Sequence, residues 1–154
     1  MIRFGLIGAG RLGKVHAANI AQLEKLAGIE ASLVAVYDPK PEAAQFMHDT
    51  YGATICQGPE DVAQFPDLDA VVIASPTYCH QDGIRAAVAA NKFIFSEKPF
   101  CRDLETGKSL LELLKDYPKF FPIGFVRRAM SKSALHFLVL AMARRTNPMA
   151  KNFG

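Results

Sequence analysis

Short apolar runs alternate with segments of helical periodicity along most of this 154-residue chain. This alternation is typical of β-α-β units, in which parallel strands are covered by helices. Several runs, such as AVVIA at 70–74, are continuously apolar, as burial on both faces of a sheet requires. We therefore predict a doubly wound α/β fold with a parallel sheet, with strands at 2–7, 31–37, 53–56, 70–74, 92–96 and 120–125 and helices at 11–26, 40–50, 59–64, 78–90 and 103–116. In the last helix Asp103 is placed as the N-cap, and we expect Leu110, Leu111, Leu113 and Leu114 to lie on one broad apolar face.

The first strand-to-helix connection contains the pattern GxGxxG at Gly8, Gly10 and Gly13. Alone the pattern is weak, but here it follows an apolar strand and opens a long helix. In that setting Gly8 makes the tight turn, Gly10 lets a pyrophosphate approach the backbone, and Gly13 lets the helix lie close to the strand. The unpaired N–H groups of the helix start face the phosphates. We predict a dinucleotide site whose residues at this turn are Gly8, Gly10, Arg11, Leu12 and Gly13.

An acidic residue, Asp38, ends the second predicted strand, 25 residues after Gly13. A carboxylate at this point can accept hydrogen bonds from the ribose hydroxyls of adenosine and repels a 2′-phosphate. We therefore expect NAD to be preferred to NADP, although Lys40 moderates that preference. Two alternatives stay open: Asp38 is a solvated turn residue before Pro39, or the loop binds a nucleotide derived from methionine.

Four segments together make residues 2 to about 128 resemble the Gfo/Idh/MocA family of sugar and inositol dehydrogenases: GLIGAGRLGKVHAANI, AVYDPK, ASPTYCHQDGIRAAVAANKFIFSEKPF and GFVRR. The triplet Glu97-Lys98-Pro99 is the most specific element. The resemblance implies that residues 1–128 form a dinucleotide-binding Rossmann domain. It also implies hydride transfer between NAD and a hydroxyl of a sugar or cyclic polyol. The second domain of the family, which supplies most of the substrate pocket, is missing here, so we expect the chain to be inactive alone.

The resemblance also implies roles for single residues. Lys98 matches a lysine that lies near the nicotinamide and hydrogen-bonds the reacting hydroxyl, and the Lys98–Pro99 bond matches one that is often cis. We therefore assign Lys98 as catalytic, unless it only reaches water or pairs with Glu97. His16 is expected to be structural, and Thr77 has the alternative of capping the next helix. The remaining candidate cofactor-binding residues are Ser75, Pro76, Thr77, His80, Glu97 and Lys98 itself.

The end of the chain differs from the rest in charge. Residues 1–116 hold 11 Lys/Arg against 15 Asp/Glu, whereas residues 117–154 hold 7 Lys/Arg and no acid. Residues 129–154 form a divergent basic and apolar tail, in which LHFLVLAMA at 135–143 is expected to be helical. The tail is either the product of a lost reading frame or premature stop, or an evolved segment that covers the domain or pairs with a second copy. In both cases we expect a homo-oligomer.

Several classes of site and location are disfavoured. The three cysteines form no CxxC or Cys/His cluster, so we expect small buried thiols and no metal. The basic residues of the tail are scattered without a reader motif, which disfavours nucleic acid. No apolar stretch is long enough to span a membrane, so we expect a cytoplasmic protein. A non-catalytic nucleotide-binding or regulatory module, or a purely structural domain, remains an alternative to an enzyme.

Overall fold

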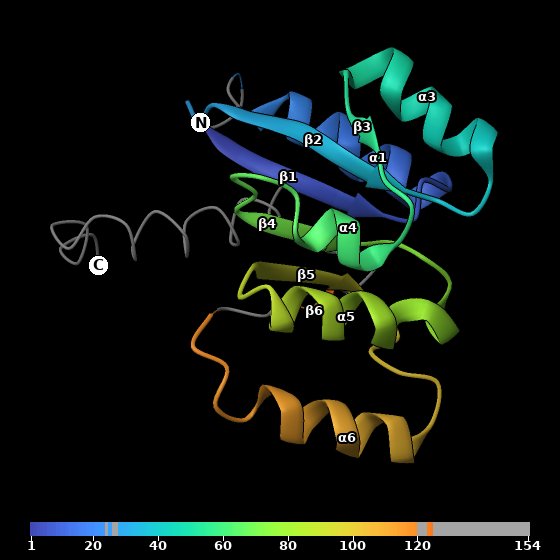
Figure 1. The fold of residues 1–154 in the computed structure, drawn as a ribbon, viewed down its shortest axis with the longest axis vertical. Coiled ribbons are helices and arrows are strands. Elements are labelled where there is room, and N and C mark those ends of the chain that lie inside the picture. The colour runs from blue at the N-terminus through green and yellow to red at the C-terminus, as the bar shows by residue number, and fades with distance from the viewer. Residues whose placement is uncertain (24, 26–27, 120–122, 125–154) are drawn as a thin grey trace, which may run out of the picture.

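The computed structural model describes residues 1–23, 25, 28–119 and 123–124. Within these residues six strands form one sheet in the order β3-β2-β1-β4-β5-β6, and every neighbouring pair is parallel (Figure 1). The doubly wound fold expected from the sequence is confirmed. The strands are β1 (Ile2–Ile7), β2 (Ala31–Tyr37), β3 (Thr54–Ile55), β4 (Ala70–Ile73), β5 (Phe93–Glu97) and β6 (Ile123–Gly124).

Helices cover both faces of the sheet, because consecutive strand residues point to opposite sides. Val72 and Phe95 face one core together with α1 and α3, whereas their neighbours Val71 and Ile94 face a second core with α4, α5 and α6. Figure 1 shows α4 and α5 on the viewer's side of the sheet and α1 behind it. The helices are α1 (Arg11–Ala21), α3 (Pro41–Tyr51), α4 (Pro59–Ala63), α5 (His80–Ala89) and α6 (Leu104–Leu114), and a 3-10 turn, η1 (Thr77–Cys79), precedes α5.

The boundaries of several elements differ from the predicted ones. Helix α1 ends at Ala21 instead of continuing to residue 26. Gln22 is a turn residue, Leu23 and Lys25 are helical again, and residues 24, 26 and 27 lie outside the described part. Strand β3 has only two residues, both exposed at the edge of the sheet. The predicted strand at 120–125 is described only as Ile123–Gly124.

Helix α6 is capped as predicted but buries less of its apolar side than expected. Asp103 accepts a hydrogen bond from the Thr106 backbone amide at 2.8 Å, which is an N-cap contact. Leu110 is fully buried and Leu114, one turn later, contacts the same core. Leu111, however, is 64% exposed. The expected single broad apolar face was therefore wrong, because an outer helix of an α/β layer contacts the protein along one narrow stripe only.

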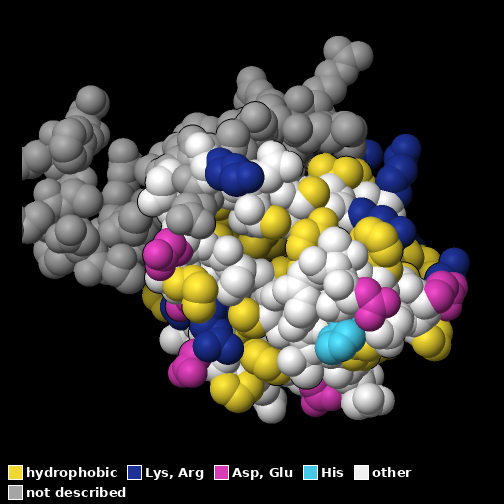
Figure 2. Space-filling model, turned by 90° about the horizontal axis from the view of Figure 1, so that it is seen from above, with side chains coloured by type: hydrophobic (Ala, Val, Ile, Leu, Met, Phe, Trp, Pro, Cys, Tyr) yellow, Lys and Arg dark blue, Asp and Glu magenta, His cyan; other side chains and the backbone are white. Residues whose placement is uncertain are grey.

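The surface of the described residues mixes both signs of charge. On the face shown in Figure 2, Lys and Arg side chains are interspersed with Asp and Glu side chains, and hydrophobic side chains lie between them. Across the described residues, no helix combines the length and the apolar character that crossing a bilayer demands.

The order of the strands creates a crevice at the carboxyl ends of the central strands β1 and β4. The chain runs outward from β1 to β2 and β3 on one side, and from β4 to β5 and β6 on the other. The connections that follow β1 and β4 therefore leave in opposite directions from neighbouring strands. In open parallel sheets ligands bind at this switch point, beyond the carboxyl ends of the strands. Ile7 and Ile73 pair in register in these neighbouring strands. The glycine turn that follows Ile7 and the segment that follows Ile73 therefore both lie at this switch point.

Candidate functional site

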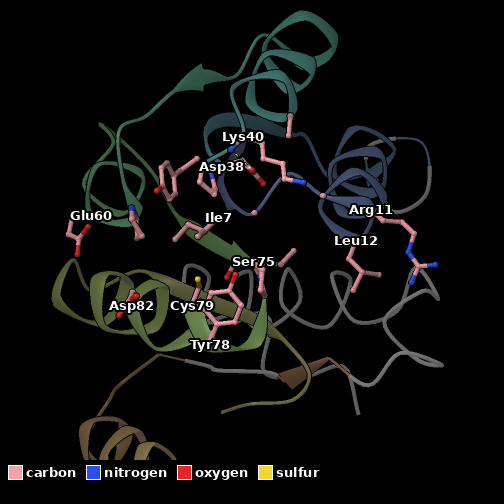
Figure 3. A pocket seen from close by; sticks show the side chains of 18 residues that line it. Ile7, Arg11, Leu12, Asp38, Lys40, Glu60, Ser75, Tyr78, Cys79 and Asp82 are labelled. Carbon is pink, nitrogen blue, oxygen red and sulfur yellow. Dashed lines mark hydrogen bonds between the residues drawn. The ribbon is translucent and has the colours of Figure 1, made fainter. Parts of the chain in front are cut away.

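A cavity of about 700 Å³ lies at this switch point. Figure 3 shows that several elements build its wall: the start of α1 with Arg11 and Leu12, the segment after β2 with Asp38 and Lys40, the connection from β4 into α5, and Glu60 of α4. The volume lies within the range of about 300 to 1,000 Å³ found for small-molecule and cofactor sites.

The three glycines of the turn have different environments. Gly8 has a φ of +96°, and a Cβ placed on it would lie 2.4 Å from the Ser75 amide nitrogen. A Cβ on Gly13 would lie 2.1 Å from the Gly8 carbonyl oxygen. Both positions therefore require glycine for the fold itself. A Cβ on Gly10 would meet no atom within 4 Å, and Gly10 lines the cavity. The space in front of Gly10 is left open by the protein.

The start of α1 is suited to an anion. Gly10 is its N-cap residue and provides no side-chain cap, and the first turn contains no acidic residue. No acidic residue of the helix's own first turn therefore neutralises the N–H groups at this end and the positive end of the dipole. Arg11 belongs to the same wall, and Figure 3 shows its guanidinium group directed away from Ile7 and Ser75. Unpaired backbone amides at a helix start are groups that bind phosphate oxygens.

Asp38 is held in place by two backbone amides. Its Oδ2 accepts a hydrogen bond from the Ala9 amide at 2.7 Å, and its Oδ1 accepts one from the Lys40 amide at 2.9 Å. The first bond ties the end of β2 to the glycine turn. Each carboxylate oxygen has a second lone pair, so Asp38 can still accept from a hydroxyl in the cavity.

The carboxyl end of β5 contains a buried acid. Glu97 is 3% exposed, its Oε1 lies 2.7 Å from His16 Nε2, and its Oε2 accepts from the Lys98 amide at 3.3 Å. Burial raises the pKa of Glu97, but the contact with His16 and the Lys98 amide outweighs burial, so the pKa lies below its ordinary value. The Lys98 side chain is exposed, and the Lys98–Pro99 bond is cis.

The predicted site residues divide into two groups. The wall of the cavity contains Gly8, Gly10, Arg11, Leu12, Asp38, Ser75 and Pro76. The wall does not contain Gly13, Thr77, His80, Glu97 and Lys98. Thr77 lines a separate polar cavity of about 80 Å³ beside Arg102 and Thr106. His80 is buried, and its ring nitrogens lie against two backbone carbonyls instead of facing the cavity.

Sequence reasoning missed several residues of the wall. Tyr78, Cys79 and Asp82 line the cavity directly after the predicted Ser75-Pro76-Thr77 turn, so the helical period beyond that turn was a usable signal. Glu60 reaches the wall from α4. No local pattern marks Glu60, because α4 belongs to a different crossover.

The cysteines differ from the sequence expectation. Cys56, Cys79 and Cys101 are free, and all three are half-buried instead of fully buried. Each lies in or next to a connection, just beyond β3, in η1 or in the loop after β5, where solvent reaches the side chain. Burial raises the pKa of the Cys79 thiol, and the nearby Asp82 carboxylate raises it further. Cys79 is therefore a protonated, weakly reactive thiol at neutral pH.

Comparison with known proteins gives a consistent family match. Residues 2–125 match the model of the GFO_IDH_MocA group, described as an oxidoreductase family with an NAD-binding Rossmann fold. An inositol 2-dehydrogenase of Rhizobium meliloti is 39% identical over 127 residues, which are 82% of this chain and 37% of that protein. A scyllo-inositol 2-dehydrogenase (NAD(+)) of Bacillus subtilis is 37% identical over 128 residues, which are 82% of this chain and 36% of that protein.

Solved structures show the same relationship. The scyllo-inositol dehydrogenase of Lactobacillus casei, solved with NAD(H) and scyllo-inositol, superposes with a TM-score of 0.74 at 32% identity and covers 94% of this chain and 42% of that one. The myo-inositol dehydrogenase of the same organism, solved with NAD(H) and myo-inositol, has a TM-score of 0.74 at 31% identity. The match covers 83% of this chain and 38% of that one. This chain thus spans a little over a third of the length of the curated relatives it matches.

Proposed function

The chain belongs to the Gfo/Idh/MocA oxidoreductase family, and on that premise we propose that its cavity binds NAD in preference to NADP. The described residues are the NAD-binding Rossmann domain of this family. The observation that carries the proposal is the open space at Gly10, at the N-terminus of α1. A pyrophosphate in that space would accept hydrogen bonds from the amides of the helix start, with Arg11 beside it.

The preference for NAD rests on the charges of the wall. Asp38, Glu60 and Asp82 place three carboxylates around the cavity, against the two cations Arg11 and Lys40. Asp38 accepts hydrogen bonds from a ribose diol but repels a phosphate in the same position. We expect calorimetry to give a dissociation constant at least about tenfold lower for NAD than for NADP. We expect Asp38→Asn to reduce that ratio, and an equal or stronger heat with NADP would contradict the preference.

The reaction we propose is oxidation of a hydroxyl on a cyclic polyol, the type of substrate named for the relatives. NAD accepts the hydride in such a reaction, so the protein has to bind both molecules and move one proton. Lys98, exposed at the carboxyl end of β5, is the group we assign to that proton. Because the relatives are far longer, we expect the 154-residue chain to bind NAD without oxidising a polyol by itself.

A non-catalytic dinucleotide-binding module is the second candidate. It is favoured by the exposed position of Lys98, outside the wall of the cavity. NADH formation from myo-inositol, followed by its absorbance, tests the first candidate. Turnover that Lys98→Ala abolishes supports an enzyme, whereas NAD binding without turnover is what both candidates expect of the 154-residue chain.

The sharpest test of NAD binding uses two N-cap glycines. Gly10 and Gly58 both precede a helix in an extended conformation, but only Gly10 lines the cavity. We expect Gly10→Val to weaken NAD binding at least about tenfold in calorimetry, and the matched control Gly58→Val to change it by less than about threefold. Both variants should keep the thermal midpoint of the native chain, because a Cβ at Gly10 would meet no atom within 4 Å and a Cβ at Gly58 would meet only the Glu60 side chain, at 3.4 Å. Unchanged NAD affinity in Gly10→Val contradicts the proposed site.

We also propose a cytoplasmic location and self-association through residues 129–154. Three free, half-exposed thiols support the first, because reducing compartments keep thiols unpaired. The second rests on the apolar sequence LHFLVLAMA, and this tail lies outside the described residues.

A further inference from the structure

Two buried histidines are bonded to the residues on either side of Lys98. His16 contacts the side chain of Glu97, the residue before Lys98, and His80 contacts the carbonyl of Pro99, the residue after it. Each histidine is 1% exposed. His16 belongs to α1 and His80 begins α5, so the two reach the end of β5 from opposite faces of the sheet.

The contact of His16 with Glu97 joins residues 81 positions apart. The Nε2–Oε1 distance is 2.7 Å, and the imidazole ring also meets the Phe95 ring edge-on at 5.0 Å. Among the described residues, Nδ1 of His16 has no hydrogen-bond partner. A ring protonated at Nε2 therefore satisfies the carboxylate and leaves no buried N–H unpaired. The other oxygen of Glu97 accepts from the Lys98 amide, so the contact extends from α1 to the backbone of Lys98.

The contact of His80 joins the two connections that follow β4 and β5. Nδ1 lies 2.9 Å from the Pro99 carbonyl oxygen, and Nε2 lies 2.8 Å from the Ser75 carbonyl oxygen. Each carbonyl oxygen can only accept, and the roles of the two ring nitrogens depend on the tautomer, so the ring donates to at least one of the two carbonyls. Ser75 lines the cavity. The His80 ring therefore fixes the position of the segment after Lys98 relative to the wall of the cavity.

We propose that His16 and His80 are positioning residues that clamp the backbone on both sides of Lys98. The proposal rests on the proposed role of Lys98 and deepens it. The lysine is exposed and follows the last residue of β5, so packing does not fix its position. His16 connects that position to the helix that starts at the glycine turn, and His80 connects it to the Ser75 segment. The lysine is thereby held in register with both parts of the dinucleotide site.

The test measures the hydrogen exchange of single backbone amides by NMR in the protein without NAD. In His16→Leu we expect the Lys98 amide to exchange at least about tenfold faster relative to the Val72 amide in the core. His16→Gln, whose amide can still donate to Glu97, should restore slow exchange. His80→Leu should likewise speed exchange at Lys98, and His80→Gln should restore it in part. The control His48→Leu, in α3, removes a bond to the Ala53 carbonyl beyond the end of that helix and should leave the Lys98 exchange unchanged.

Calorimetry with NAD on the same proteins separates this proposal from the proposed function. If the native chain gives no heat with NAD, the proposed NAD binding is wrong. The hydrogen exchange of the Lys98 amide then still tests whether His16 and His80 hold the backbone around Lys98. Equal Lys98 exchange in the native chain and in both leucine variants overturns the clamp. If a leucine variant does not fold, long-range proton–nitrogen spectra of the native chain decide. They must show a slowly exchanging Nε2–H on His16 and a slowly exchanging ring N–H on His80, and their absence overturns the proposal.

Discussion

At the scale of single residues, one short motif contains glycines of different kinds. Gly8 and Gly13 are required by contacts within the protein, whereas Gly10 is surrounded by open space at the cavity. The first two are therefore required for the folding of the turn, and Gly10 is the one that we propose for the ligand. The motif alone predicted this division of roles, and the structure supplies the contacts that require glycine at Gly8 and Gly13.

This division predicts effects of different size on stability for two substitutions. Gly8→Ala forces a side chain into a positive φ and against the Ser75 backbone, so we expect a loss of more than about 2 kcal/mol in the free energy of unfolding. Gly10→Ala should change that free energy by less than about 1 kcal/mol. Urea denaturation followed by circular dichroism measures both. Equal losses in the two variants would show that the environments of Gly8 and Gly10 do not differ as described.

Glu97 predicts a pH dependence of stability. Its pKa in the folded protein lies below the ordinary value of 4.5, so the ionised form is stabilised by folding. The contribution is fully present above about pH 4.5 and is lost as the pH falls through the lowered pKa of the folded state. We expect the stability difference between the native chain and Glu97→Gln to be constant near neutral pH and to shrink below 4.5. A difference that does not change in acid, measured by urea titration, would speak against an ionised Glu97.

At the scale of elements, the leucines of the outer helix α6 differ in how deeply they are buried. Leu110 is fully buried against α5 and the sheet, and its sequence neighbour Leu111 faces solvent. Residues four apart lie on one side of a helix, so Leu114 shares the buried stripe with Leu110. The stripe, and not the number of leucines, determines how much α6 stabilises the domain.

The two neighbouring leucines make a matched pair. Leu110→Ala creates a cavity and should lower the free energy of unfolding by about 2 to 5 kcal/mol. Leu111→Ala removes an exposed side chain and should change it by no more than about 0.5 kcal/mol. Thermal or urea unfolding of both variants gives the comparison. Similar losses for both would mean that Leu111 is covered in solution, for example by another part of the chain.

At the scale of the whole molecule, the family match ends where the composition changes. The match covers residues 2–125, and the basic, apolar tail follows. A run such as LHFLVLAMA is unfavourable in water, because burying apolar surface releases free energy at roughly 25 cal/mol per Å². We therefore predict from the sequence that the chain self-associates through residues 129–154.

Light scattering of the native chain tests this prediction. We expect a dimer or larger species at micromolar concentration, and a monomer when residues 129–154 are removed. A monomer in both cases would exclude the tail as an interface. A dimer in both would place the interface on the Rossmann domain instead.

The sequence by itself determined the alternation of strands and helices, the glycine turn, the cap at Asp103 and the acid at Asp38. Each of these depends on local requirements: a period of two or 3.6 residues, a positive φ, or a side chain next to its own backbone amides. All could therefore be predicted from neighbours in the chain. The place of Gly10, Asp38 and Ser75 at the cavity could also be predicted from the sequence. These residues follow parallel strands, and the carboxyl ends of parallel strands lie side by side.

Only the tertiary structure decided which side chains meet across the fold. Glu97 was expected at the cofactor, and the structure places it against His16, 81 positions away. Glu60 reaches the cavity from another crossover, and Leu111 is exposed although its neighbour is buried. The physical reason is that such contacts depend on how helices lie on the sheet. That arrangement is set by the packing of the whole core and leaves no trace in the local sequence pattern.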